Sequence, residues 1–295
     1  MIDNMPLFGQ KLKSGKFVVT SEITPPKGND ISSVLNISDS LKGWVDAINI
    51  TDNNRAVMRM SPLALGKILA DTGHNVIMQM TCRDRNRLAI QSDLLGANTM
   101  GIDSICLMTG DHTTKGDHPG AKPVYDLDSV QLLSMVKKLT QGYDFSGNQL
   151  EGTPHFTVGV VSNTDISQKM QMMKLKKKAE MGVDFIQTQA VYDLDQFKEF
   201  VESVKHLGIP IIAGIIPLKS AKMARFMNNN IPGIKIGDDI ICRLENAKDP
   251  VYEGLAISAE TINEIRDICN GVHIMPIGKS LNTVNLLEMA GFSPE

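Results

Sequence analysis

The sequence is poor in cysteine, and the cysteines it has are far apart. Cys82, Cys106, Cys242 and Cys269 include no C-x-x-C pair. They therefore predict neither a disulfide framework nor a zinc or iron–sulfur motif, and we expect no metal site. Reduced and mostly buried thiols are the simpler interpretation.

Long hydrophobic runs and an excess of charge of one sign are also missing. Residues 1–9 lack the basic and then apolar segments of a secretory leader, and no later run reaches the roughly 18 apolar residues of a membrane-spanning helix. The formal net charge is −3, and no long lysine or arginine tract occurs. These absences argue against nucleic-acid and membrane partners and predict a cytoplasmic protein.

What the sequence does contain is a repeated alternation of apolar runs and amphipathic stretches. Hydrophobic residues make up 42% of the 295 positions, enough for a large core. Eight short runs rich in β-branched residues are nearly continuous in apolar character, as expected for parallel strands covered on both faces. The predicted strands are Phe17–Ile23, Val45–Thr51, Asn75–Thr81, Asp103–Thr109, His155–Val161, Asp184–Gln189, Ile209–Ile216 and Gly271–Ile277.

Amphipathic stretches between these runs predict about one helix per strand, with an extra helix before the eighth strand. No proline-rich or serine-rich linker divides the chain. We therefore predict an α/β fold, a single (β/α)8 or TIM barrel domain over residues 1–295. The predicted helices are Ile31–Leu41, Pro62–Thr72, Arg87–Gly96, Asp128–Thr140, Ser167–Met181, Leu194–His206, Ser220–Asn228, Ser258–Cys269 and Leu281–Ala290.

An open, doubly wound sheet is the alternative architecture. Such a sheet usually has a glycine-rich phosphate-binding turn after its first strand. Here the first predicted strand runs into Pro25 and Pro26, which lack the backbone donors that bind a pyrophosphate. This turn favours the barrel.

Polar residues follow most of the predicted strands. The active site of a barrel forms at the carboxyl ends of its strands, so these residues are site candidates. A role as a turn or helix cap is the alternative for Thr51, for Thr109 and for the pair Ser162-Asn163. In chain order the candidates are Glu22, Thr51 with Asp52 and Asn53, Thr81, Thr109 with Asp111, Ser162 with Asn163, and Gln189.

Glu22, Asp111 and Gln189 have the most distinctive settings. Glu22 ends an apolar strand before two prolines, where an unpaired carboxyl group is costly, and this suits a general acid. Asp111 follows Gly110, which permits close approach of a planar ligand, although Asp111 also suits a cap. Gln189 offers a donor and an acceptor to the edge of a heterocycle such as a pterin. The basic run 174–178 is either a solvated helix face or a source of a phosphate ligand.

Several segments occur in the order and approximate spacing of methylenetetrahydrofolate reductases, and the chain resembles that family over essentially its whole length. Each segment alone is a weak signal, whereas the ordered set is specific. Residues 81–87 and 110–112 resemble the short, catalytic-domain-only forms found in anaerobic one-carbon pathways. The segments are Ser21–Pro26, Met80–Cys82, Met108–His112, Leu175–Lys178 with Gly182, Thr188-Gln189 and Gly214–Pro217.

The resemblance implies a flavin-dependent enzyme that reduces 5,10-methylenetetrahydrofolate to 5-methyltetrahydrofolate by a ping-pong hydride transfer. By the family pattern, Glu22 would be the general acid that helps open the folate ring, and Asp111 would act near both pterin and flavin. Glu22, Asp111 and Gln189 would bind the folate substrate. The implied cofactor-binding residues are Thr51, Thr81, Thr109, Gly110, Asp111, Tyr125, Asn163 and Lys178.

The chain departs from the family pattern at two places. Residues 162–167 replace a turn and longer loop that help hold the outer part of a flavin dinucleotide, so both FAD and FMN stay open. Ala190 occupies a position that is often aromatic, which weakens a stacking wall for nicotinamide or folate. Because the chain lacks clustered cysteines, these features suggest an electron-donating iron–sulfur partner subunit. We also expect an oligomer.

Two other functions stay open at this point. The first is a flavin-free, folate-binding barrel that serves as a subunit of a larger one-carbon assembly. The second is a different barrel enzyme, such as an aldolase or a pterin methyltransferase. An aldolase would need a Schiff-base lysine, and no predicted strand ends in lysine.

Overall fold

The eight predicted strands form a closed parallel barrel in the computed structural model, which describes residues 8–277 and 281–295. The strands pair in chain order, and β8 closes the barrel against β1. The predicted fold class is therefore confirmed, and each strand lies inside or within one residue of its predicted range. The bounds are β1 Val18–Ile23, β2 Ala47–Ile50, β3 Val76–Thr81, β4 Ser104–Met108, β5 Thr157–Ser162, β6 Phe185–Ala190, β7 Ile211–Ile215 and β8 Gly271–Ile274.

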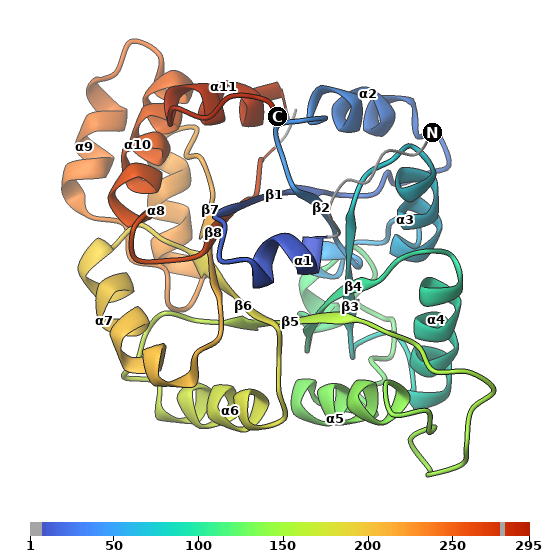
Figure 1. Cartoon of the computed structure of the whole chain (residues 1–295). Coiled ribbons are helices and arrows are strands. Elements are labelled where there is room, and N and C mark those ends of the chain that lie inside the picture. Colours follow the sequence, from blue (N-terminus) through green and yellow to red (C-terminus); the bar gives the residue numbers. More distant parts are fainter. Residues whose placement is uncertain (1–7, 278–280) are drawn as a thin grey trace.

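Helices surround the barrel (Figure 1). Two of them were not predicted, the short α1 and the amphipathic α9, and α10 begins at Pro250 rather than at Ser258. Pro250 follows Asp249, whose side chain caps the helix, so the start signal was present. The helices are α1 Phe8–Lys13, α2 Ser32–Ser40, α3 Pro62–Asp71, α4 Arg87–Thr99, α5 Ser129–Leu139, α6 Lys169–Glu180, α7 Leu194–Val204, α8 Ala221–Asn230, α9 Asp238–Asn246, α10 Pro250–Ile265 and α11 Leu281–Met289, with 3-10 turns at Asn54–Ala56, Thr113–Lys115 and Lys205–Leu207.

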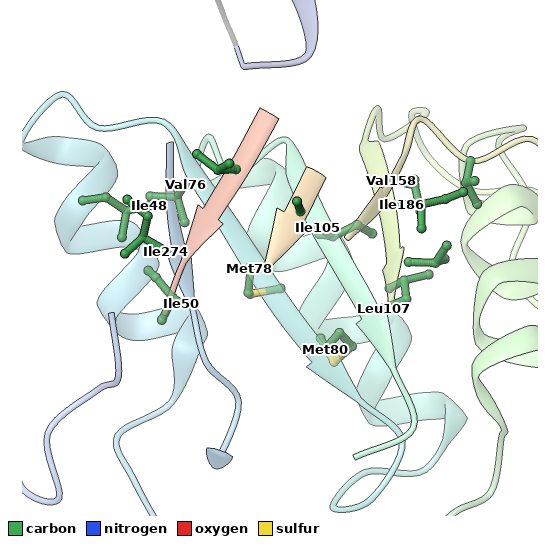
Figure 2. Close-up of a cluster of buried hydrophobic side chains, with 14 of the residues drawn as sticks. Ile48, Ile50, Val76, Met78, Met80, Ile105, Leu107, Val158, Ile186 and Ile274 are labelled. Atoms are coloured by element: carbon green, nitrogen blue, oxygen red, sulfur yellow. The ribbon is translucent and has the colours of Figure 1, made fainter. Parts of the chain in front are cut away.

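The main core lies between the barrel and the helices. Side chains alternate along each strand, and one set points outward to meet the apolar faces of the helices. Figure 2 shows part of this outward set, with Ile48, Met78 and Ile105 among its labelled members. All three are fully buried and belong to one cluster. Because the strands are apolar on this face too, they appear as continuous hydrophobic runs in the sequence.

The amino-terminal end of the barrel is closed by α1, which lies across it in Figure 1. Phe8 of α1 meets Phe185 edge to face, with ring centroids 5.5 Å apart. Gly159 makes room for that ring, because a Cβ atom there would lie 2.1 Å from it. Helix α1 and the apolar side chains inside the barrel therefore close its amino-terminal end, which we call the apolar floor. A ligand must enter at the opposite, carboxyl end.

A second cluster packs α8, α9 and α10 against the end of β6. Ala190 is 7% exposed and belongs to this cluster together with Leu218, Leu244 and Ile257. None of the helices in the two described ranges combines the length and apolar character needed to cross a bilayer.

Candidate active site

The interior of the barrel changes from apolar to polar along its axis. Near α1 it is filled by residues such as Val18, Ile77 and Phe185. One step toward the carboxyl ends, the same inward face carries polar side chains that are at most 6% exposed. Barrel interiors are usually packed with bulky branched residues, so a polar layer marks the edge of a site. The layer consists of Thr20, Asn49, Gln79, Gln187 and His273.

A hydrogen bond crosses the barrel within this layer. The Asn49 Nδ2 atom of β2 donates to the Gln187 Oε1 atom of β6 at 2.8 Å. The side-chain oxygen of Asn49, Oδ1, is buried and has no hydrogen-bond partner in the described part of the chain. Gln187 therefore has a structural role inside the barrel. Gln189 lies two residues further along β6, on the same face and nearer the mouth of the barrel.

Glu22 lies directly above the polar layer. It is the penultimate residue of β1, and its side chain is 14% exposed. Its Oε2 atom is 3.9 Å from Nε2 of His273, a fully buried residue of β8. The prediction of a carboxyl group enclosed by an apolar strand agrees with this placement.

Several buried polar atoms near the mouth have no hydrogen-bond partner within residues 8–277 and 281–295. They include Oγ1 of Thr51, Oε1 of Gln189 and Nε2 of His273. Native proteins pair the great majority of such atoms, so the unpaired atoms of Thr51 and Gln189 at the mouth leave places for the polar groups of a ligand. Thr51 and Gln189 were both predicted as ligand-binding residues, and that role stays a prediction.

The ends of β2, β3 and β4 are held together by a buried ionic network. Arg83 is 2% exposed and forms a bidentate pair with Asp84 at 2.8 and 2.9 Å. Its third nitrogen, Nη1, donates to the carbonyl oxygen of Asp111 at 3.2 Å, and Nη2 also donates to the carbonyl oxygen of Asn53 at 3.1 Å. Burial is the largest single influence and lowers the pKa of Arg83, but the hydrogen bond to Asp84 and the negative charges of Asp84 and Asp52 together outweigh it and raise that pKa.

Asp52 completes this network. Its carboxylate accepts from Arg85 at 2.8 and 3.1 Å and from the backbone and hydroxyl of Thr81 at 2.9 and 2.8 Å. The hydroxyl of Thr81 is therefore already engaged. Thr81 supports the site wall, and its Cβ atom would lie only 3.0 Å from a Cβ atom placed on Gly110.

Thr109, Gly110 and Asp111 form the rim of the wall after β4. Gly110 has a φ of +84° and close neighbours, so only glycine fits there without strain. Thr109 and Asp111 are exposed, and Asp111 Oδ1 lies 3.5 Å from the Lys115 ammonium. The hydroxyl of Tyr125 donates to the Gly110 carbonyl at 3.2 Å, so Tyr125 lies against this rim, and its binding of a cofactor stays a prediction.

Lys178 and Asn163 lie in different surroundings from each other. Lys178 of α6 is 5% exposed, and burial lowers the pKa of its ammonium group. No carboxylate lies within ion-pair distance of it in the described chain, which suits an anionic ligand group. Asn163 instead accepts from the Asp165 backbone at 2.9 Å, so it forms a turn and its carbonyl oxygen is already engaged.

The cysteines are unpaired, as predicted. Cys82 and Cys106 are buried, Cys269 is partly buried, and Cys242 is exposed. Burial raises the pKa of Cys82 to about 12, so this thiol beside the wall stays protonated and unreactive at neutral pH.

Reasoning from the sequence missed Thr20, Asn49 and His273, and it missed the structural role of Arg83. The signal for the first three was present, because each is a polar residue inside an apolar strand. Thr20 and Asn49 lie two residues before Glu22 and Thr51 and therefore share their inward face. Asp84 is the next residue in the chain, but the other partners of Arg83 are backbone carbonyls in the loops after β2 and β4, and no local pattern indicates them.

Together, the fold and these side chains define a (β/α)8 barrel of the kind that carries an active site at the carboxyl ends of its strands. The sequence profile of the family described as methylenetetrahydrofolate reductase matches residues 7–291. The chain belongs to that family.

Individual relatives agree with this assignment. The 5,10-methylenetetrahydrofolate reductase of Salmonella typhimurium is 24% identical over 84% of this chain and 77% of its own length. Methylenetetrahydrofolate reductase (NADH) 1 of Arabidopsis thaliana is 27% identical over 74% of this chain but only 38% of its own length. A probable methylenetetrahydrofolate reductase (NADPH) of Caenorhabditis elegans is matched over 21% of its length. The chain thus spans a minor part of these two eukaryotic relatives.

Solved structures share the fold. An uncharacterized protein from Clostridium thermocellum, described as binding two copies of 5-methyl-5,6,7,8-tetrahydrofolic acid, superposes with a TM-score of 0.68 over 96% of this chain and 98% of its own. Its sequence identity is 18%. The long-chain alkane monooxygenase LadA has a TM-score of 0.55 at 12% identity.

Proposed function

We propose that this protein reduces 5,10-methylenetetrahydrofolate to 5-methyltetrahydrofolate with a bound flavin, by a ping-pong hydride transfer. The observation that carries the proposal is Glu22, a nearly buried carboxyl group facing a barrel mouth with unpaired polar atoms. Membership of the reductase family supports it. The description of the structural neighbour from Clostridium thermocellum, which names a methylated folate as its ligand, supports the same substrate class.

The residues at the mouth fit a flavin. Gly110 offers backbone that a planar ring can approach closely, and Thr51 has an unpaired hydroxyl. Lys178 supplies a buried cation for a phosphate, which FAD and FMN share. A bound flavin would supply the hydride. Thr109, Asp111 and Tyr125 complete the proposed wall, while Thr81 supports it and Asn163 forms the turn that borders it.

Folate would lie between Glu22 and Gln189. Gln189 presents its free carbonyl oxygen to the amino or ring N–H groups of a pterin, and Asp111 would accept from the same heterocycle. Protonated Glu22 would give its proton to the nitrogen released when the folate ring opens, which leaves Glu22 as a carboxylate. The apolar floor beneath the polar layer keeps bulk water from entering from the other end.

The absorption spectrum of the purified protein tests this function. We expect yellow protein that bleaches with a reductant under anaerobic conditions and regains its colour when methylenetetrahydrofolate is added. Protein that stays colourless after flavin is supplied, yet binds folate, would instead support a flavin-free folate-binding subunit of a larger assembly. Mass analysis of the released flavin would distinguish FAD from FMN.

We further propose that the chain works in an oligomer and receives electrons from an iron–sulfur partner subunit. Ala190 supports this, because its small side chain packs in the second cluster and offers no aromatic surface to a nicotinamide. The same anaerobic experiment tests this proposal when different reductants are compared by the bleaching of the flavin that they cause. A low-potential dye is expected to bleach the protein readily, and NADH or NADPH slowly or not at all. Rapid bleaching at micromolar nicotinamide without added protein would refute the partner.

We expect Asp111→Asn to raise the midpoint potential of the bound flavin and to weaken folate binding. A carboxylate beside the ring disfavours its anionic reduced form. A carboxylate that is exposed to water, as Asp111 is, destabilises a nearby negative charge by about 1 kcal/mol. Its removal should therefore raise the midpoint potential of a two-electron couple by on the order of 20 mV. Potentiometry with Glu151→Gln, the same charge change at an exposed residue in the loop before β5, provides the control. An unchanged potential and folate affinity would make Asp111 a structural cap.

A further inference from the structure

We propose that His273 is a positioning residue that acts through Glu22, by accepting a hydrogen bond from the carboxyl group and so orienting its proton for transfer. This inference rests on the proposed function, in which Glu22 supplies the proton. It concerns a residue inside the barrel wall that touches neither cofactor nor substrate. His273 is 0% exposed, and its Nε2 atom is buried without a hydrogen-bond partner in the described residues.

The orientation of the imidazole ring is set from behind by β1. Parallel pairing places Thr20 opposite His273, and Oγ1 of Thr20 lies 2.9 Å from Nδ1. The same hydroxyl donates to the Val272 carbonyl at 3.4 Å. At 3.4 Å this second contact is long for an O–H···O hydrogen bond, so Oγ1 can either donate to Nδ1 or accept from Nδ1–H, and our proposal is the second arrangement. In a neutral ring this leaves Nε2 as an acceptor.

An acceptor at Nε2 matches only one form of Glu22. The carboxyl oxygen lies 3.9 Å away, so a side-chain shift of about 1 Å completes a hydrogen bond. A protonated carboxyl group has a proton to donate to Nε2, whereas a carboxylate has none. The Asn49 carbonyl oxygen, in register beside Glu22 on β2, is a second unpaired acceptor. Both neighbours can therefore accept the proton of the carboxylic acid and orient it.

No other charge competes for the ring among the described residues. On β1, Thr20 and Glu22 face His273, and Glu22 is the charged group within ion-pair distance of it. On β7 the register neighbour is Gly214, which has no side chain. The hydrogen bond between Asn49 of β2 and Gln187 of β6, each two strands away from β8, joins two neutral amides. Glu22 and His273 thus form a pair that is isolated from the other charges of the barrel.

The proton transfer involves Glu22 alone. The O–H bond of the Glu22 carboxyl group breaks and an N–H bond forms on the leaving folate nitrogen, so Glu22 becomes a carboxylate. His273 neither gains nor loses a proton in this step. Its contribution is to orient the carboxyl group before transfer, since general acids lose efficiency when they are held loosely.

Nitrogen-15 NMR of the histidine rings tests the pair without requiring activity. Histidine-labelled protein carries six imidazoles, and His273→Gln assigns the signal. We expect an Nδ1-protonated neutral ring in the wild-type protein, and a shifted Nε2 signal in Glu22→Gln. Thr20→Val should lose the tautomer preference, and Thr20→Ser, which keeps the hydroxyl, should retain it. A ring protonated at Nε2, or one that is insensitive to Glu22→Gln, would overturn the proposal.

Kinetics provide the second readout. His273→Gln places an amide near the Nε2 position, and His273→Asn does not. We therefore expect the folate-dependent step to be slower in His273→Gln than in the wild-type protein and slowest in His273→Asn, where the rate should fall roughly tenfold or more. The pH profile should change, and reduction of the flavin should not. Adding His273→Gln to Glu22→Gln should cost nothing further. Equal losses in both half-reactions, or multiplied losses in the double variant, would refute the role.

The two proposals fail in different ways. Wild-type protein that does not convert methylenetetrahydrofolate would remove the proposed function while leaving the NMR coupling between Glu22 and His273 measurable. Wild-type activity with an uncoupled ring would remove only the role of His273. If His273→Gln does not fold, Thr20→Val supplies both readouts, because valine has the shape of threonine.

Discussion

Glu22→Gln is expected to lower the rate of folate reduction by about 10² to 10⁴-fold, the usual contribution of a general acid. The amide fills the same volume at the end of β1 but cannot release a proton. Binding of the flavin and its reduction by a donor should continue. The deciding measurement is single-turnover oxidation of the reduced protein by methylenetetrahydrofolate, which isolates the folate half-reaction.

Glu22→Asp provides the matched comparison. It keeps an acid but withdraws it by one methylene group from the mouth and from His273, which lies 3.9 Å from the wild-type carboxylate. We expect an intermediate rate. A near-wild-type folate half-reaction in Glu22→Gln would show that the proton comes from another group, and the proposed role of Glu22 would be withdrawn.

Arg83→Met is expected to have the largest effect on stability. Removing the buried guanidinium leaves the Asp84 carboxylate without its ion-pair partner, and because that carboxylate is 32% exposed and reached by water, the cost is about 1–3 kcal/mol in free energy of unfolding. The carbonyl groups of Asn53 and Asp111 would lose a donor as well. Because Arg83 joins the loops after β2 and β4, folate and flavin affinity should fall together. Denaturant unfolding and ligand titration measure the two effects.

Arg87→Met is the control for this change. Arg87 lies four residues away in the same segment and also forms a bidentate pair, with Asp126 at 2.8 and 2.9 Å. The carboxylates left behind are exposed to a similar extent, 28% for Asp126 and 32% for Asp84, but the Arg87 side chain is itself 47% exposed and donates to no loop carbonyl among the described residues, so stability should change little. Equal losses in the two variants would mean that burial of Arg83 is not the source of its effect.

Much of the fold follows from the sequence alone. Continuous apolar strands separated by amphipathic helices have one economical arrangement when there are eight of them, and the structure confirms that barrel. One of the two missed helices, α1, had a weak local signal. The six residues of α1 are too few for a periodic pattern, and their apolar side chains become interpretable only once the barrel floor they cover is known.

Part of the candidate site could likewise be predicted from the sequence, and part depended on the tertiary structure. The polar residues at strand ends, Glu22, Thr51 and Gln189 among them, could be predicted because a barrel brings all its carboxyl ends to one rim. The register between strands decided what the sequence could not. It set Thr20 beside His273, Asn49 across from Gln187, and Arg83 beneath two loops. Those contacts join residues 28 to 253 positions apart, and hydrogen bonding over such separations depends on closure of the barrel rather than on any local pattern.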